Sequence, residues 1–300
     1  MQNSDQKITG STFGLLRCFT ARIRRGRLPS TLSFSIRQVM RVGFIGGILA
    51  MASTPIAAQS FYKEIEVASG GTITGAVHLV GDPSKSDKLE ITKDHSCCGS
   101  VKVSPRLVVG KAGAVKNAVV YLDAINEGKK FPVTPKVLLN QKKCEYDPHV
   151  LIVPQGTQMD IVNSDPILHN VHAYCGMQST FNIAQPIKGQ CTTIKRTQLS
   201  KPGPVTLTCD AGHPWMSGFV FVAPHPYYAI TDKNGNFRLE NVPPGKYTLK
   251  MWHEGVAVVD KEIEQEKVKK YIFEAPYEIT KEVTVGDGST VAVDFEFALR

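Results

Sequence analysis

The sequence predicts an all-β protein. After residue 60, the apolar residues gather in short runs rich in Val, Ile, Thr and aromatic side chains, and Gly, Pro, Asn or Asp follows each run. No long stretch has the period of an amphipathic helix, and the best helical candidate is Lys261–Lys270. Many short strands separated by frequent turns are typical of a β-sandwich or a β-barrel.

Six runs show the strand pattern most clearly. They are Thr72–Val80, Val115–Ile125, Val150–Val153, Gln158–Val162, Val205–Cys209 and Gly218–Val222. With 42% apolar and 21% charged residues, the chain has the composition of a globular protein that can bury a core.

The pattern changes near the Pro-rich segment Ala223–Pro226. Beyond it, Asp232–Gly235 separates two strand-like runs and predicts a hairpin turn. Trp252-His253-Glu254 is interpreted as the end of a strand, and Thr290–Leu299 as the closing strand. We therefore expect a leader over residues 1–58, a first β domain over 59–224 and a small second β domain over 225–300.

The first 58 residues are typical of a targeting segment. They hold eight Lys or Arg and a single acidic residue, and so account for nearly all of the net charge of +8. Met40-Arg41, the apolar run Val42–Met51 and the small residues before Gln59 have the layout of a Sec-type signal peptide, with translation starting at Met40. We expect a periplasmic or secreted protein without a membrane span in the mature chain.

The rest of the chain is nearly neutral, and no stripe of Lys and Arg interleaved with aromatics follows residue 60. This distribution argues against binding to nucleic acid.

Six of the seven cysteines follow the leader. In an oxidising compartment such cysteines tend to pair, although spacing alone does not fix the connectivity. We expect Cys98–Cys144 and Cys175–Cys191 bridges, with Cys97 left over.

The segment Thr206–Met216 carries the chemistry. A predicted strand delivers Cys209, His213 follows four residues later, Met216 three residues after that, and then the next strand begins. A thiolate, an imidazole and a thioether on one tight loop form a ligand mixture that copper favours, with two His and one Cys in a plane and a weak axial Met.

A second histidine for that site is expected from His169, which begins an extended run after a polar turn. His172 lies three residues further on, and positions i and i+3 of a strand face opposite sides. His172 is therefore a fourth ligand, a group that bonds a ligand, or a surface residue. His149 is interpreted as a turn residue just before a strand.

These motifs resemble the cupredoxins. His169-Asn170-Val171 is similar to the first-histidine segment of plastocyanin-type proteins, and the Cys209–Met216 loop is similar to the copper loop of cytochrome oxidase subunit two. That subunit's binuclear site uses a further cysteine where this chain has Val205. The resemblance implies a cupredoxin-like Greek-key β-sandwich with one copper ion, strong ligands His169, Cys209 and His213, and Met216 as the axial ligand.

A wider stretch, from about residue 95 to 257, resembles bacterial exported proteins that join a cupredoxin-like domain to a carboxypeptidase regulatory-like, transthyretin-type β domain. Five segments carry this resemblance: Cys98-Gly99, Gln141–His149, His169–Tyr174, Cys209–Met216 and His225–Glu254. It implies a small transthyretin-like β-sandwich at the C-terminal end of the chain.

The leading hypothesis is an exported mononuclear copper protein, not an enzyme, that transfers electrons or carries copper. Its partner would be a redox or copper-handling protein of the envelope. A site with every position filled by protein leaves no place for a substrate. Two alternatives remain: a metal-free adhesion or docking module that uses the regulatory-like domain, and a copper enzyme subunit with an altered site.

Overall fold

The computed structural model describes residues 62–83, 87–132 and 137–300. The expected leader and signal peptide lie outside these residues. The described part is almost entirely β, as the sequence predicts, and its helices are the four-residue α1 (His95–Cys98) and two 3₁₀ turns, η2 (Lys111–Gly113) and η3 (Arg196–Leu199). None of the helices in the described part is long and apolar enough to cross a bilayer.

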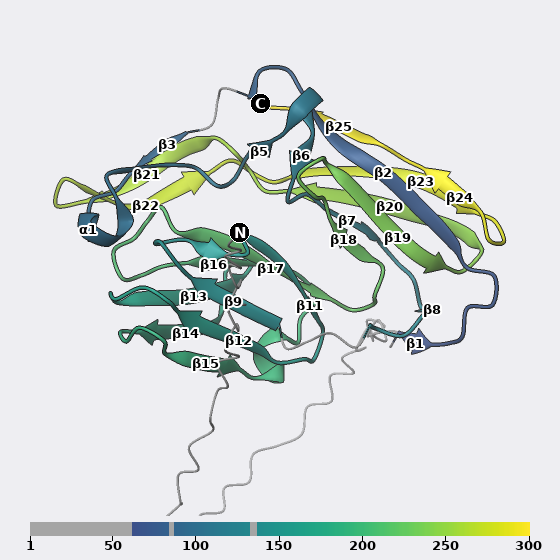
Figure 1. Ribbon diagram of the computed structural model, residues 1–300, viewed down its shortest axis with the longest axis horizontal. Coiled ribbons are helices and arrows are strands. Elements are labelled where there is room, and N and C mark those ends of the chain that lie inside the picture. The colour runs from purple at the N-terminus through teal and green to yellow at the C-terminus, as the bar shows by residue number, and fades with distance from the viewer. Residues whose placement is uncertain (1–61, 84–86, 133–136) are drawn as a thin grey trace, which may run out of the picture. The chain divides into compact units, whose positions relative to one another are not determined.

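Two sheets from the middle of the chain form a β-sandwich (Figure 1). The four-stranded sheet has the order β10 (Tyr146–Asp147), β9 (Val137–Gln141), β12 (Met159–Asn163), β15 (Cys191–Ile194). The five-stranded sheet has the order β11 (Val150–Pro154), β17 (Ser217–Ala223), β16 (Gly203–Thr208), β13 (His169–Cys175), β14 (Gln178–Gln185).

The two sheets of the sandwich share one apolar core. Leu139 and Ile161 from the first sheet and Val171 and Val220 from the second are all fully buried in the same cluster. β-Branched side chains on alternate strand positions fill this space, so the alternation in the sequence sets which face of each strand is inward.

A second β unit is built from strands that come before and after the sandwich strands along the chain. One sheet has the order β18 (Tyr228–Ile230), β7 (Val119–Leu122), β20 (Gly245–His253), β23 (Tyr277–Val285). The other has the order β19 (Asn236–Val242), β2 (Gly71–Val80), β24 (Thr290–Ala292), and β25 (Phe295–Ala298) pairs with the far half of β2. The strands β2 and β7 thus pair with the last third of the chain, and the sequence-based division at residue 224 does not follow the sheets.

Short two-stranded pairs complete the fold of the described part. They are β1 (Lys63–Glu64) with β8 (Glu127–Gly128), β3 (Lys88–Glu90) with β4 (Val101–Val103), β5 (Val108–Val109) with β6 (Val115–Lys116), and β21 (Val258–Glu264) with β22 (Lys267–Phe273).

Two local predictions are corrected. The expected helix at Lys261–Lys270 is wrong, because these residues form the β21–β22 hairpin, whose turn residues Gln265 and Glu266 adopt positive φ angles of 49° and 64°. The Asp232–Gly235 turn forms, with the Gly235 N–H donating to the Asp232 carbonyl. Its flanking strands, however, pair with β7 and β2 in different sheets and not with each other.

Candidate metal centre

Three predicted ligands converge inside the sandwich. The Nδ1 atoms of His169 and His213 lie 3.1 Å apart, and the Cys209 Sγ lies 3.5 Å from the His213 Nδ1. The three donor atoms all lie within 4.8 Å of one another. Both histidines are fully buried and Cys209 is 6% exposed, so the donors face a common point away from bulk water.

The strands place these side chains by simple alternation. His169 is the first residue of β13 and shares its inward face with the core residues Val171 and Ala173. Cys209 directly follows β16. The loop then bends at Gly212, whose φ of +84° suits glycine, and this bend brings His213 back over Cys209.

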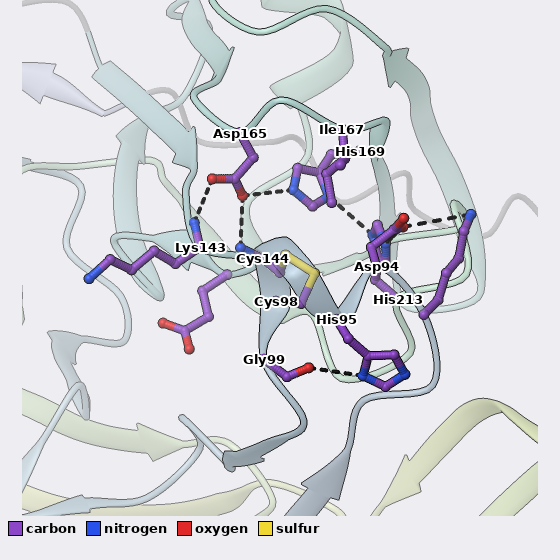
Figure 2. The surroundings of a disulfide bond; sticks show 12 residues. Asp94, His95, Cys98, Gly99, Lys143, Cys144, Asp165, Ile167, His169 and His213 are labelled. Carbon is purple, nitrogen blue, oxygen red and sulfur yellow. Dashed lines mark hydrogen bonds and ion pairs between the residues drawn. A yellow bond between two sulfur atoms is a disulfide. The ribbon is translucent and has the colours of Figure 1, made fainter.

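A carboxylate holds the outer nitrogen of each histidine. Asp165 Oδ2 lies 2.9 Å from the His169 Nε2, and Asp94 Oδ2 lies 2.8 Å from the His213 Nε2 (Figure 2). A carboxylate accepts hydrogen bonds, so each Nε2 carries the proton and each Nδ1 presents a lone pair to the centre. This is the arrangement by which proteins orient metal-binding imidazoles.

Asp165 is itself held in place by the neighbouring backbone. The N–H groups of Lys143 and Cys144 donate to its two carboxylate oxygens, both at 2.8 Å. Burial alone would raise the pKa of Asp165, but these N–H groups and the His169 ring together lower it. The carboxylate therefore stays charged beside the histidine.

Without a metal, the inner face of the site is neutral. Burial lowers the pKa of His169 and of His213, and the carboxylate bonds oppose this effect only in part. Burial also raises the pKa of the Cys209 thiol to about 11, although the N–H groups of Ala211 and Asn170 bond its sulfur. A metal that binds here must displace the thiol proton, which makes its affinity pH-dependent.

Asn170 links the two ligand segments. Its backbone N–H donates to the Cys209 Sγ at 3.4 Å, and its side-chain oxygen accepts the Asp210 N–H at 3.1 Å. The hydroxyl of the buried Tyr146 lies within 2.7 Å of the carbonyl oxygens of Asn170 and Thr208, the residues beside His169 and Cys209. The strand ends that carry the ligands are thus fixed before any metal binds.

The remaining loop residues, Trp215 and Met216, are buried, and Trp215 packs against a predicted ligand. Trp215 is 2% exposed, its ring centroid lies 5.1 Å from that of His213, and its Nε1 donates to the Cys144 carbonyl. Met216 is also 2% exposed, and its N–H donates to the His213 carbonyl to close the turn before β17. The role of Met216 as the axial ligand stays a prediction.

His172 lies on the other side of β13. Its Nδ1 pairs with Asp210 Oδ2 at 2.6 Å and its Nε2 bonds the Ser179 hydroxyl at 2.9 Å. The centroid of its ring lies 4.1 Å from that of Tyr174, the next outward residue of the strand. His172 is not among the converging donors, and the three-residue offset from His169 explains why.

One of the two expected disulfides is present. Cys98 on α1 is bonded to Cys144 (Figure 2). The predicted Cys175–Cys191 bridge is wrong, because Cys175 is a free thiol. Cys175 ends β13 in one sheet of the sandwich, whereas Cys191 begins β15 in the other.

Sequence reasoning missed the carboxylates that orient the histidines. Asp165 lies in the polar turn four residues before His169, and that spacing could have drawn attention to it. Asp94 lies more than a hundred residues before His213 and carries no local signal.

Comparison with protein families gives one match. Residues 224–293 match the model of polysaccharide lyase family 4, domain II. The match covers the last part of the chain, and the expected transthyretin type of this region stays a prediction. No curated protein sequence matches the chain.

Solved structures similar to this chain include copper proteins. A Cu-containing nitrite reductase from Thermus scotoductus SA-01 is 24% identical with a TM-score of 0.26, over 34% of this chain and 25% of its own. A purple cupredoxin from Nitrosopumilus maritimus is 19% identical with a TM-score of 0.24, over 29% of this chain and 100% of its own. A Cu(I) form of an amicyanin variant is 23% identical with a TM-score of 0.26, over 31% and 86%.

The chain thus spans a quarter of the nitrite reductase. Each likeness is confined to about a third of this chain.

Proposed function

We propose that this protein binds one copper ion through His169, Cys209 and His213, with Met216 as a weak axial ligand, and that it transfers electrons or carries copper outside the cytoplasm. The observation that supports the proposal most is the convergence of two Nδ1 atoms and one Sγ, each within 4.8 Å of the others, on three buried residues. A metal ion that binds among these three donors takes the place of the Cys209 thiol proton.

The donor set favours copper over other common metals. Structural zinc sites take four strong ligands in a tetrahedron, and oxygen-rich sites suit calcium or magnesium. Two imidazoles, one thiolate and a thioether form the set in which copper changes oxidation state with little movement. The carboxylates of Asp165 and Asp94 support that property, because they fix both rings from behind.

The burial of the centre favours a carrier of electrons over an enzyme. Cys209 is 6% exposed, both histidines are fully buried, and Trp215 packs against His213. A substrate would need an open coordination position that faces water. The feature that supports a location outside the cytoplasm is the signal-peptide layout expected at Met40–Gln59.

The test is the visible and EPR spectrum of the exported protein loaded with Cu(II). We expect an intense thiolate-to-copper band with one copper per chain, and no change of that band when azide is added. Cys209→Ser should abolish the band, whereas the matched control Cys175→Ser, which alters a free thiol outside the site, should retain it. A wild-type protein that binds no copper, or an unchanged band in Cys209→Ser, would contradict the proposal.

A further inference from the structure

A second group of sulfur atoms lies beside the metal centre. The Sγ atoms of Cys97, Cys98 and Cys144 all lie within 4.8 Å of one another. Cys98 and Cys144 form the disulfide, whereas the half-buried Cys97 is a free thiol. The bond therefore has a third sulfur next to it that takes no part in it.

The backbone holds these three residues independently of the disulfide. The N–H groups of Cys97 and Cys98 both donate to the Asp94 carbonyl at 2.9 Å, which forms the short turn of α1. The Cys144 N–H donates to Asp165 at 2.8 Å, and its carbonyl accepts the Trp215 Nε1. Opening the disulfide would thus leave three thiols close together on a fixed backbone.

The sulfur cluster and the metal centre share their supports. Asp165 Oδ2 bonds both the Cys144 N–H and the His169 ring (Figure 2). Asp94 bonds α1 through its carbonyl and His213 through its carboxylate. Donor atoms of Cys144, Asp165 and His169 also lie within 4.8 Å of one another, so an ion among the sulfurs would lie next to the first site.

We propose that Cys97, Cys98 and Cys144 form a second metal site, a three-thiolate site for Cu(I), when the disulfide is reduced. A reduced dithiol gives two electrons and two protons to the Cys98–Cys144 bond and becomes a disulfide itself. Cu(I) then binds the three sulfurs and displaces their protons to water. Soft thiolates select Cu(I) over harder cations.

This site deepens the proposed copper function. The redox state of one disulfide sets how much copper the protein holds: a single ion when the bond is closed and a second when it is open. Because Asp165 and Asp94 touch both sites, a Cu(I) ion held by the sulfurs is positioned to pass to, or from, the centre at Cys209.

The experiment is an anaerobic Cu(I) titration of the exported protein against a chromogenic Cu(I) chelator. One sample keeps the disulfide, and the other is reduced with a phosphine, desalted and checked by thiol counting. We expect one equivalent of Cu(I) in the oxidised protein and two in the reduced protein. Cys97→Ser should still form the Cys98–Cys144 disulfide when oxidised but should bind only one equivalent of Cu(I) when reduced. Cys175→Ser should bind two equivalents when reduced, like the wild type.

Cys209→Ser separates this proposal from the proposed function. In that variant we expect no tightly bound Cu(I) when oxidised and one equivalent when reduced, because the sulfur cluster is intact. A reduced wild-type protein that binds a single equivalent would overturn the inference and leave the first site untouched. Two equivalents in reduced Cys97→Ser, held as tightly as in the wild type, would also overturn it.

Discussion

Two clusters in this protein bury histidines against carboxylates, and they differ in which way their donors face. In the metal centre, Asp165 and Asp94 bond the outer nitrogens, and the inner nitrogens face each other and the Cys209 sulfur. In the second cluster, Glu254 lies between His149 and Arg106. Glu254 is 1% exposed. Its Oε2 lies 3.0 Å from a guanidinium nitrogen of Arg106, and its Oε1 pairs with the His149 Nε2.

This difference is the reason that we interpret the first cluster as a candidate metal site and the second as a structural ion cluster. Burial alone would raise the pKa of Glu254, but His149 and Arg106 lower it, so the charges compensate one another without an added ion. The Arg106 guanidinium also lies 3.5 Å from the centre of the Phe273 ring. In the candidate metal centre, two ring nitrogens and one thiol sulfur converge, and a metal ion can bind them by displacing the thiol proton. A buried histidine and carboxylate therefore signal a site when the remaining donors point inward together.

The largest expected effect comes from removing the central charge of the second cluster. Glu254→Gln leaves the Arg106 guanidinium buried without its counter-charge, which costs about 3–5 kcal/mol of unfolding free energy. Urea unfolding monitored by tryptophan fluorescence measures this loss. The matched control is Glu240→Gln, because Glu240 pairs with Arg238 in an exposed bridge and its loss should leave stability unchanged. Equal stabilities of the two variants would show that the buried cluster is not structural.

Another buried histidine, His225, lies outside both clusters and pairs with no carboxylate of the described residues. His225 is 3% exposed and accepts the Tyr227 N–H on its Nδ1, and burial lowers its pKa from 6.5 to about 4. The unfolded chain therefore binds the proton first as the pH falls. The stabilising effect of neutral His225 is complete above pH 6.5 and is lost towards pH 4, by about 3 kcal/mol.

The measurement for His225 is a series of unfolding curves between pH 7 and pH 4 for the wild type and His225→Phe. The variant removes the titrating ring, so its loss of stability over this range should be smaller by about that amount. Parallel curves for the two proteins would mean that the pKa of His225 is the same in the folded and the unfolded chain, which contradicts the prediction.

A smaller effect is expected when the support of a metal ligand is weakened. Asp165→Asn removes the charge behind His169 and should lower copper affinity by about 10–100-fold, with the copper band still present but shifted. A competition titration with a chelator measures the affinity. Asp160→Asn is the control, because Asp160 is a buried carboxylate of β12 that accepts the Thr193 hydroxyl at 2.6 Å. Similar losses in both variants would point to a general destabilisation instead.

The smallest effect is expected at His172. Its ring bonds Asp210 and Ser179 on the outward face of β13. His172→Ala should leave the copper band and the copper affinity unchanged, because the strand places this ring away from the converging donors. A lost or strongly shifted band in this variant would return His172 to the ligand set.

The sequence predicts most of the strands, and it also singles out His169, Cys209 and His213, which converge in the fold, because both depend on local pattern. Alternation assigns His169 to the inward face and His172 to the outward face of β13. The Cys-to-Met loop is visible because its donors lie within eight residues of one another. The Lys261–Lys270 segment fails for the opposite reason: its charged residues fit a helix and an exposed hairpin equally well.

The features that the sequence does not predict depend on contacts between segments far apart in the chain. The pairing of β2 with β19 and β25 and of β7 with β20 carries no local signal, so the second β unit is not recognisable as discontinuous. For the same reason, Asp94 behind His213 and the charge cluster at Glu254 emerge only from the folded chain.

X-ray absorption at the copper edge of the loaded protein identifies the atoms bound to the metal and so tests whether His169, Cys209 and His213 hold it. We predict a shell of one short sulfur and two imidazole nitrogens, with the sulfur absent in Cys209→Ser and one imidazole absent in His213→Ala. A shell of nitrogen and oxygen alone in the wild type, or the same shell in all three proteins, would contradict the assignment of the centre to His169, Cys209 and His213.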